Sequence, residues 1–325
     1  MQNVIVTTTI SPPSSALLKY TRAKVGFYQP GETNPKWHII VAGDKRTPHN
    51  EYTNLEGITY LHPDQQHEMF PELSDTIGWN CIQRRYAAVL YAYKKNAEIF
   101  AFADDDNIPY SNWGDDADLL NNEVEAELYR DEVNNMFDPY SATNHPELWH
   151  RGYPLDLVRK RKPLYCGHRN IKPLVIERLV DGDPDIDAIY RLPFRPTVKF
   201  KEQLFTSYQP TVFNSQNTLV AREVIPYYLN LPGVGRHDDI IGSILFQRLF
   251  PNKDSLPYIA FSSSTVYQER YPQDLVRNLE MEIFGYRHTL DIASKPINEL
   301  SRILPPQAVK AYKLWNEFFN VKTEL

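Results

Sequence analysis

Two periodicities of apolar residues divide the first hundred residues into short segments. Apolar, β-branched runs predict strands at residues 4–9, 37–42, 58–61 and 99–103. Between them, apolar side chains recur every three or four residues over 14–24 and 80–96, which predicts helices. Strands that alternate with helices are typical of a parallel sheet covered on both faces. We therefore expect an α/β fold.

The pattern changes after residue 106. Residues 107–163 show no sustained period and are first acidic, then rich in His, Pro and Tyr. A buried strand and loop are expected at 211–221, and a helix with an apolar face is expected to begin at Asp238. The many Pro and Tyr residues indicate ordered loops around a polar, aromatic cleft.

The last part of the chain reads as helices from about Tyr271, interrupted at Pro296 and at Pro305. A chain of 325 residues with 42% hydrophobic residues can bury the core of one large domain with an appendage. We expect a catalytic domain at 1–265 and a C-terminal helical extension at 266–325.

Three consecutive carboxylates, Asp104, Asp105 and Asp106, follow the strand predicted at 99–103. Adjacent carboxylates repel one another and need solvent, a cation or both. In an α/β sheet, ligands bind at the carboxyl ends of strands, and hard cations prefer oxygen ligands. An extended strand end would place Asp104 and Asp106 on one side and Asp105 on the other. We interpret the triplet as a site for Mg²⁺ or Mn²⁺ and a nucleotide diphosphate; a solvated loop is the simpler alternative.

Two further motifs combine charge with turn residues. Arg151, followed by Gly-Tyr-Pro, could clamp a phosphate, lie at the anomeric carbon of a sugar, or belong to a structural turn. Residues 235–239, GRHDD, bring together Arg, His237, Asp238 and Asp239. Asp238 suits a helix N-cap, a general base or a metal ligand, and His237 suits a metal ligand or a hydrogen-bonded structural residue.

Polar side chains also gather where their partners are not evident from the sequence. Residues 214–218 carry amides and hydroxyls in apolar surroundings, and buried polar groups need partners. Sugar hydroxyls would supply them, as would a turn that satisfies its own backbone. Arg84 and Arg85 precede the strand of the triplet, and one of them could face a diphosphate; surface charge is the alternative.

Charge and composition exclude some classes of function. The formal charge of −6 does not fit a nucleic-acid binder. Two cysteines cannot form a disulfide framework, so a reducing compartment, the cytoplasm, fits best. The first residues lack a basic segment typical of a signal peptide, and no run of 18 apolar residues predicts a membrane span.

The order of these motifs resembles two related groups of proteins. One is the reversibly glycosylated polypeptides, which include UDP-arabinopyranose mutases; the other is the STELLO-like glycosyltransferase proteins. Segments similar to both are the opening strands at 4–9 and 37–48 and the sequence FADDDNIP at 102–109. The likeness spans roughly residues 4–250.

Other segments resemble one group more than the other. DPY at 138–140 and RGYP at 151–154 are similar to the mutases, and GRHDD is similar to their GRYDD element, with His237 in place of Tyr. DGDPDIDAIYRL at 181–192 and FNSQNT at 213–218 are closer to the STELLO-like proteins.

The resemblance implies a glycosyltransferase type A fold and a UDP-sugar donor. It implies a divalent metal at the triplet, with Asp104 and Asp106 as ligands. Nucleotide-sugar contacts are expected from residues of the matching segments and from the preceding helix: Thr7, Asp44, Arg84, Asp104, Asp105, Asn217 and His237. The expected catalytic residues are Arg151, which matches the self-glycosylated position of the mutases, and Asp238 and Asp239, which would orient or deprotonate an acceptor hydroxyl.

Three hypotheses follow, in this order. The first is a metal-dependent glycosyltransferase that uses a nucleotide sugar and an unidentified glycan or other hydroxyl acceptor. The second is a mutase that interconverts pyranose and furanose rings of the bound sugar. The third is a non-catalytic scaffold. Mutase-like relatives tend to associate, so a homo-oligomer is possible.

Overall fold

The computed structural model describes residues 3–21, 37–251, 259–270, 272–323 and 325. Its N-terminal strands are β1 (Asn3–Thr9), β2 (His38–Gly43), β3 (Ile58–Leu61) and β4 (Ile99–Ala103). The segments between them are α1 (Ser15–Thr21), α2 (His49–Thr53), α3 (Pro63–Met69), α4 (Pro71–Ile77), the 3₁₀ turn η1 (Ile82–Arg84) and α5 (Arg85–Lys94). The sequence predicted these strands closely.

The four N-terminal strands are parallel. β1 lies between β2 and β4, and β2 pairs with β3. Helix α5 packs against β1 and β2, and its buried face includes Tyr86, Val89 and Leu90. Periodic apolar positions therefore placed this helix correctly, although its first turn is 3₁₀. Residues 22–24 of the helix predicted at 14–24 lie outside the described residues.

The later strands are β5 (Asn107–Pro109), β6 (Val124–Asp131), β7 (Pro163–Ile171), β8 (Val175–Arg178), β9 (Asp181–Gly182), β10 (Leu204–Ser207), β11 (Asn217–Ala221), β12 (Ile259–Ser262) and β13 (Val266–Gln268). The later helices are α6 (Leu155–Val158), α7 (Ala188–Arg191), α8 (Asp238–Leu249), α9 (Leu275–Ser294), α10 (Leu300–Ile303) and α11 (Pro306–Phe318). Short 3₁₀ turns are η2 (Asp115–Leu119), η3 (Pro139–Ala142), η4 (Arg222–Tyr227), η5 (Gly235–His237) and η7 (Ile297–Glu299).

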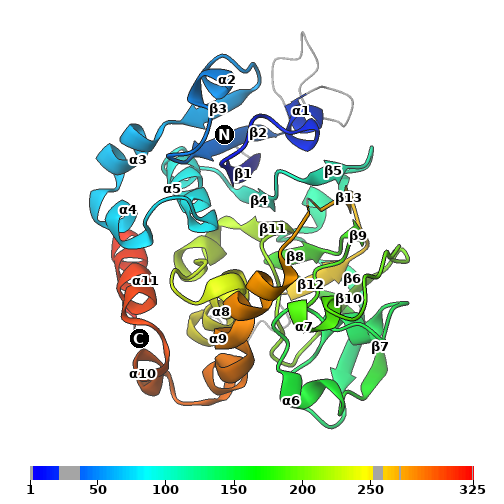
Figure 1. Ribbon diagram of the computed structural model, residues 1–325. Helices are drawn as coiled ribbons and strands as arrows, with labels where there is room; N and C mark the ends of the chain where they lie inside the picture. The colour runs from blue at the N-terminus through cyan, green and yellow to red at the C-terminus, as the bar shows by residue number, and fades with distance from the viewer. Residues whose placement is uncertain (1–2, 22–36, 252–258, 271, 324) are drawn as a thin grey trace.

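In the described part of the chain, the main sheet has ten strands in the order β3-β2-β1-β4-β11-β8-β12-β10-β6-β7, and a smaller sheet has the order β5-β13-β9 (Figure 1). The α/β class is confirmed, but the all-parallel sheet is not. β11 runs antiparallel to both β4 and β8. The later strands are joined by loops and short helices, so the strand–helix alternation that predicts parallel pairing does not extend to them.

The absence of regular structure expected at 107–163 is wrong for β5, β6, α6 and the start of β7. In β6, the apolar residues Val124, Ala126 and Leu128 alternate with exposed or half-buried polar residues. That two-residue period is typical of a strand with one solvated face. β7 is an edge strand whose side chains are mostly exposed, so it carries little apolar signal.

The C-terminal helices begin at the predicted breaks. Pro296 directly precedes η7, and Pro305 directly precedes α11. Before them, β13 belongs to the smaller sheet, where it pairs with β5 and β9. The division of the chain at residue 265 stays a prediction.

Helix α11 attaches to the body of the protein through an aromatic core and through hydrogen bonds from its side chains to backbone carbonyl groups. The ring of Trp315 lies 5.1 Å from that of Tyr86, edge to face. Trp315 Nε1 donates to the carbonyl oxygen of Ile225 at 2.8 Å, and Asn316 Nδ2 donates to that of Pro226 at 2.8 Å. Both carbonyl groups belong to η4, so these side chains satisfy backbone acceptors near the end of this short turn.

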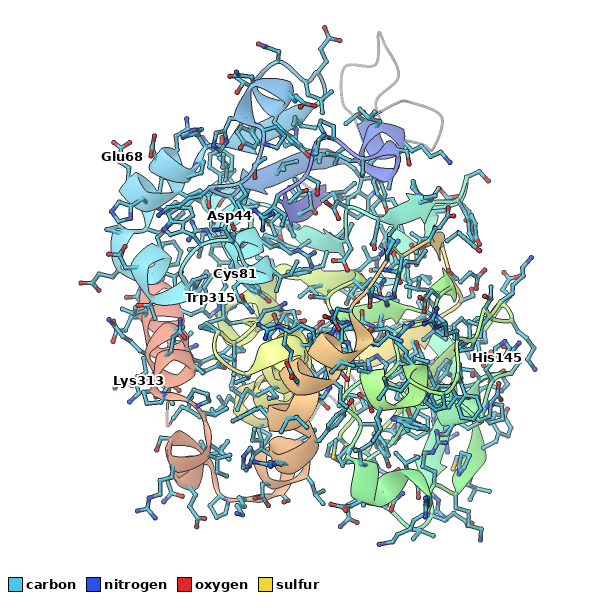
Figure 2. All side chains as sticks on the ribbon, viewed as in Figure 1. Asp44, Glu68, Cys81, His145, Lys313 and Trp315 are labelled. Carbon is cyan, nitrogen blue, oxygen red and sulfur yellow. The ribbon has the colours of Figure 1, made fainter. Side chains whose placement is uncertain are left out.

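We predict that Trp315→Ala destabilises the whole domain. Trp315 is fully buried, and a cavity of this size typically costs about 3–5 kcal/mol. Urea unfolding measures the loss. The matched control is Lys313→Ala in the same helix, where the side chain is exposed and lies at the outer edge of the molecule (Figure 2). Equal, small effects of both substitutions would show that α11 is not part of the cooperative core.

Candidate functional site

Two adjacent cavities open where β4 ends. The larger, of about 410 Å³, is lined mainly by polar and charged residues that include Asp104, Arg151, Asp238 and Asp239. The smaller, of about 280 Å³, is lined by residues that include Ser14, Ser15, Asp105, Asp106 and Arg270. Arg270 lines both cavities. The acidic triplet therefore lies at the carboxyl end of β4, where an α/β sheet typically binds its ligand.

The triplet forms a turn rather than an extended strand end. The backbone N–H of Asn107 donates to the carbonyl oxygen of Asp104 at 3.3 Å, and the N–H of Asp104 donates to that of Gln216 at 3.1 Å. Thr9 Oγ1, at the end of β1, donates to Asp105 Oδ2 at 2.6 Å. Because the chain turns, strand alternation does not apply: Asp104 lines the larger cavity, and Asp105 and Asp106 line the smaller one.

Carboxyl groups in this turn hold protons more tightly than usual. Burial raises the pKa of Asp104, although the ion pair with Arg85 opposes the rise. Burial and then the charge of Asp104 raise the pKa of Asp106 to about 6. Gln268 Nε2 donates to both oxygens of Asp106, at 3.2 and 3.1 Å. The turn therefore carries electrostatic repulsion that a bound cation would relieve.

The donor set of the turn fits a hard divalent cation. Asp104 and Asp106 offer carboxylate oxygens, and the Asp104 side chain is 32% exposed toward the cavity. In the described part of the chain, the triplet does not bring three ligand atoms together. Mg²⁺ and Mn²⁺ commonly keep few protein ligands and take the others from water and substrate phosphates. Asp104 and Asp106 thus suit a cation that binds together with a phosphorylated ligand.

Of the two neighbouring arginines, Arg85 reaches the acidic turn. Its Nη2 pairs with Asp104, and its Nη1 donates to Ser215 Oγ at 3.3 Å. Arg84 is buried elsewhere: its Nε donates to Gln66 Oε1 at 3.0 Å, and its guanidinium lies 3.9 Å from the ring centre of Trp79. Arg84 lines neither cavity. One residue at a helix start changes direction by about 100°, so the sequence did not separate the two.

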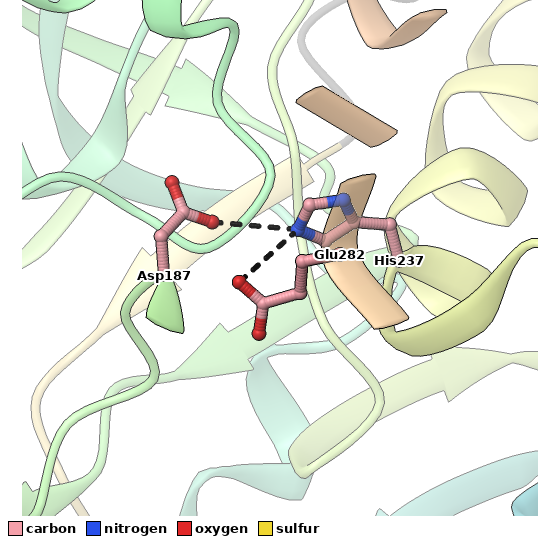
Figure 3. Close-up of side chains that lie close together, drawn as sticks. All are labelled: Asp187, His237 and Glu282. Carbon is pink, nitrogen blue, oxygen red and sulfur yellow. Dashed lines mark hydrogen bonds and ion pairs between the residues drawn. The ribbon is translucent and has the colours of Figure 1, made fainter. Parts of the chain in front are cut away.

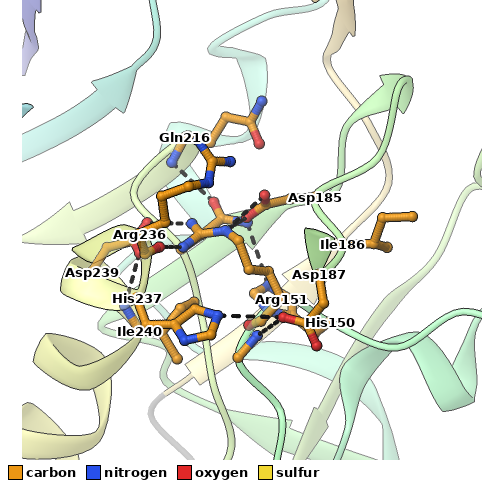
Figure 4. A network of polar contacts seen from close by, with 12 residues as sticks. His150, Arg151, Asp185, Ile186, Asp187, Gln216, Arg236, His237, Asp239 and Ile240 are labelled. Atoms are coloured by element: carbon orange, nitrogen blue, oxygen red, sulfur yellow. Dashed lines mark hydrogen bonds and ion pairs between the residues drawn. The ribbon is translucent and has the colours of Figure 1, made fainter. Parts of the chain in front are cut away.

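Arg151 is held between carboxylates in the wall of the larger cavity (Figure 4). Its Nε lies 2.9 Å from Asp185 Oδ1, and its Nη2 lies 2.9 Å from Asp239 Oδ2. Its Nη1 donates to the carbonyl oxygen of Arg236. Burial would raise the pKa of Asp185, but the positive charges of Arg151 and Arg270 and the hydrogen bond from Arg151 together keep this pKa below its ordinary value. Arg151 therefore fixes two acids in place, which is the structural alternative noted from the sequence.

Asp238 and Asp239 begin α8 and have different partners. Asp239 pairs with Arg151 and accepts the backbone N–H of Ser215 at 3.0 Å. Asp238 Oδ2 accepts a hydrogen bond from the neutral amide of Gln83 at 2.8 Å. Burial and then the charge of Asp239 raise the pKa of Asp238 to about 7. Asp238 is not an N-cap, because His237 occupies that position and no side-chain cap bond forms. Its catalytic function stays a prediction, and a raised pKa in a cavity is typical of groups that exchange protons near neutral pH.

His237 lies outside both cavities, in a buried cluster with Asp187 and Glu282 (Figure 3). Its Nε2 is 3.3 Å from Asp187 Oδ1 and 4.0 Å from Glu282 Oε2. The three ligand atoms are close enough to hold a metal ion. However, Asp187 Oδ1 also accepts the N–H of Gly152 at 2.8 Å, and Glu282 Oε2 also accepts that of Ala188 at 2.7 Å.

The surroundings of His237 favour a structural function. His237 Nδ1 is buried, and no hydrogen-bond partner for it occurs among the described residues. A metal-bound histidine normally donates its second ring N–H to an acceptor. Glu282 Oε1 accepts Arg236 Nε at 3.1 Å, which links α9 to η5. This cluster joins the C-terminal helix to the turn that precedes Asp238 and Asp239.

Helix α9 approaches η5 very closely, and two glycines permit this. A Cβ added to Gly285 would lie 1.6 Å from His237 Nδ1. A Cβ added to Gly235 would lie 1.8 Å from the carbonyl oxygen of Met281, and Gly235 has φ of +74°. Both positions therefore require glycine for contact, and Gly235 also for backbone conformation.

Three other predicted contact residues support the walls without lining either cavity. Thr7 lies in β1 with its buried Oγ1 lacking a hydrogen-bond partner among the described residues. Asp44 Oδ2 accepts the backbone N–H of Cys81 at 3.1 Å, which ties the end of β2 to the start of η1. Asn217 Nδ2 donates to the carbonyl oxygen of Arg178 at 3.2 Å. Their proposed contacts with a nucleotide sugar stay predictions.

In the polar segment at 214–218, some side chains are satisfied within the protein and others are available to a ligand. Asn214 Nδ2 donates to Glu177 Oε1 at 2.8 Å, and Thr218 Oγ1 donates to the carbonyl oxygen of Asn214 at 2.7 Å. These groups are satisfied within the protein. Ser215 and Gln216 instead line the larger cavity, and the buried Gln216 Oε1 has no hydrogen-bond partner among the described residues. Gln216 is thus available to a ligand hydroxyl.

Sequence reasoning missed two charged residues of the site. Asp185 was noted only as part of the segment at 181–192, and Arg270 follows a strand that was not predicted. The signal for Asp185 was present, because two acids and a proline surround it in a segment similar to the STELLO-like proteins. For Arg270 there was no local signal, since only the pairing of β13 with β5 brings it to the acidic turn.

Comparisons with known proteins give a distant similarity. The chain is 24% identical over 196 residues to the "Probable glycosyltransferase STELLO2" of Arabidopsis thaliana and 23% identical over 194 residues to "Probable glycosyltransferase STELLO1" of the same plant. Each match covers 57% of this chain and 25% of the relative, so the chain spans about a quarter of the length of these relatives. No protein-family model matches.

Among solved structures, one described as the "Crystal Structure of a Mycobacterial Protein" aligns with a TM-score of 0.44 and 13% identity, over 91% of this chain and 76% of that chain. The sequence likeness to STELLO proteins is confirmed, whereas the likeness to mutases stays a prediction. The fold is α/β with a large central sheet, as predicted, and this architecture is consistent with the expected glycosyltransferase type A fold. None of the helices in the described ranges combines the length and apolarity that a membrane span needs.

We predict that Gly285→Ala loosens the contact between α9 and η5. The added Cβ collides with His237, and overpacking of this kind costs about 1–3 kcal/mol. In a His237→Ala background the collision is gone, and Gly→Ala within a helix becomes neutral or stabilising by up to about 1 kcal/mol. Thermal unfolding of the four proteins in this double-mutant cycle checks the coupling. Additive effects would contradict the close packing described here.

Proposed function

We propose that this chain is a glycosyltransferase that takes a nucleotide-diphosphate sugar, most simply a UDP-sugar, and depends on Mn²⁺ or Mg²⁺. The observation that carries the proposal is the position of Asp104 and Asp238 in one cavity, next to Asp105 and Asp106 in the other. Asp104, Asp105 and Asp106 suit a cation with a diphosphate, and Asp238 suits the function of a proton acceptor. Similarity to proteins named as probable glycosyltransferases supports the same class of reaction.

In this mechanism, the residues of the chain bind and orient the donor and move one proton. Asp104 and Asp106 would hold the cation, which when bound neutralises charge on the departing diphosphate. Asp238 accepts the proton of the acceptor hydroxyl. The acceptor oxygen then bonds to the anomeric carbon as the bond from that carbon to the phosphate oxygen breaks, and the nucleoside diphosphate leaves.

The remaining residues of the cavity keep this arrangement rigid. Asp239 and Asp185 are fixed by Arg151, so their charges are compensated before a ligand binds. Gln216 is available to hydrogen-bond a sugar hydroxyl. Charges held in place in a partly closed cavity need little reorganisation during the reaction, which is the largest contribution to catalysis in many enzymes.

The contacts of Arg151 favour the transferase over the mutase, because the mutases are glycosylated at the position that Arg151 matches. Each nitrogen of its guanidinium is engaged, by Asp185, Asp239 or the carbonyl oxygen of Arg236. Glycosylation there would break a buried pair of ion contacts, a change that is typically costly. Chromatography of UDP-arabinose or UDP-galactose after incubation separates the two reactions, since a mutase changes the ring form without consuming the nucleotide sugar.

We predict that the double substitution Asp104→Asn plus Asp106→Asn abolishes metal-dependent turnover. Loss of one preorganised charged contact commonly lowers kcat by about 10²–10³-fold. The assay is release of UDP from a panel of UDP-sugars with Mn²⁺ and without it. Asp64→Asn, at an acid whose side chain is 93% exposed, is the matched control and should retain full activity. Turnover that survives the double substitution would contradict the proposed metal site.

We predict that Asp238 sets the pH dependence of both activity and stability. Its carboxyl must be ionised to accept a proton, so kcat/KM should rise with pH and level off above about 7. Its pKa is raised from an ordinary 3.8, so the folded state holds the proton more tightly than the unfolded state. The stability from this group is present at low pH and is lost as pH rises through about 7.

Asp238→Asn tests the stability side directly. The amide oxygen can still accept from Gln83, while the buried charge is absent. The variant should be inactive, yet more stable than the parent at pH 8, and this advantage should be smaller by about 2–3 kcal/mol at pH 5, where the folded carboxyl of the parent is protonated. Urea unfolding at the two pH values measures this. A stability difference that does not change between pH 5 and pH 8 would show that Asp238 is not the titrating group.

A further inference from the structure

Arg270 is a buried cation at the junction of the two cavities. It follows β13 by two residues, and only 11% of its side chain is exposed. It lines the larger cavity together with Asp104 and the smaller one together with Asp105 and Asp106. A ligand that extends from one cavity into the other must therefore pass its guanidinium.

Unlike Arg151, whose three guanidinium nitrogens are all engaged, Arg270 has unused hydrogen-bond donors. Its Nε lies 3.5 Å from Asp183 Oδ2, and its Nη2 lies 3.6 Å from Asp185 Oδ1. These separations exceed a normal hydrogen bond. Both nitrogens are buried and have no hydrogen-bond partner among the described residues. Buried donors without acceptors are costly and rare, so such a group points to a missing partner.

The nearby acids do not supply that partner, because other arginines already hold them. Asp185 is paired with Arg151 at 2.9 Å, and Asp183 is paired with Arg191. Arg270 thus keeps a loose electrostatic attraction to both acids without a directional bond. A guanidinium with free donors on one edge matches the paired oxygens of a phosphate group.

We propose that Arg270 binds the diphosphate of the donor, with the nucleoside in the smaller cavity and the sugar in the larger. This assignment rests on the proposed function and adds which residue recognises the diphosphate. The chemistry of each cavity agrees with it. The lining of the smaller cavity includes Ser15, and that of the larger includes Asp238 and Gln216. A diphosphate is the link between nucleoside and sugar, so it belongs at the junction.

The same arrangement places the diphosphate between two positive charges. Asp104 and Asp106 face the junction from the β4 side, where they suit a cation, and Arg270 faces it from the β13 side. Positive groups on both sides would hold the phosphates and stabilise the charge of the leaving diphosphate.

Calorimetric titration with UDP and with UMP, each with Mn²⁺, tests the assignment. Arg270→Gln should weaken UDP binding about 10- to 100-fold, because charge-assisted hydrogen bonds are lost, and should change UMP binding less than about threefold. Arg270→Lys keeps the charge without the planar fork and should weaken UDP binding to an intermediate degree. The control Arg277→Gln removes the same charge from an exposed position on α9 and should bind UDP normally.

The outcomes distinguish failure of this assignment from failure of the proposed function. If the parent protein binds UDP and Arg270→Gln binds it equally well, the assignment is overturned and the proposed function stands. If Arg270→Gln weakens UDP and UMP by the same factor, Arg270 supports the fold of the site and does not read the diphosphate. If the parent binds neither UDP nor GDP with Mn²⁺, the proposed function fails, and this assignment fails with it. Thermal unfolding of the ligand-free variants verifies that each is folded.

Discussion

The structure depends on how it places several carboxylates around one partly buried cavity. Carboxylates in such a site repel one another and lose solvation, so each needs a cation or a proton. Arg85 compensates Asp104, and Arg151 compensates Asp185 and Asp239. Asp238 keeps an amide partner and a raised pKa instead. The chemistry of the site follows from which acid is left without a close cation.

The arginines and acids come from distant parts of the chain, so the site forms only with the complete fold. The acidic turn is fixed by β1 through Thr9 and by the loop before β11 through Gln216. The start of α8 is fixed by α9 through the cluster of His237, Asp187 and Glu282. C-terminal helices thus contribute to the position of Asp238 although they do not line most of the cavity. Stability of these helices and activity of the site are therefore linked.

Local signals in the sequence explain what could be predicted. The N-terminal strands are buried on both faces and rich in β-branched residues, and the triplet directly follows one of them, so its place at a strand end was predictable. β6 has one solvated face, and β7 is an exposed edge, so their apolar signal is weak. Arg270 could not be found, because strand pairing between distant segments determines its position. Arg84 and Arg85 differ by one residue at a helix start, where direction depends on the exact first turn.

A crystal structure of the protein with UDP and Mn²⁺ tests the central claim most directly. The account predicts a cation bound by carboxylate oxygens of Asp104 and Asp106, with the diphosphate between this cation and Arg270 and the uridine in the smaller cavity. A nucleotide bound at another surface, or a cation bound at His237 while the acidic turn stays empty, would contradict it.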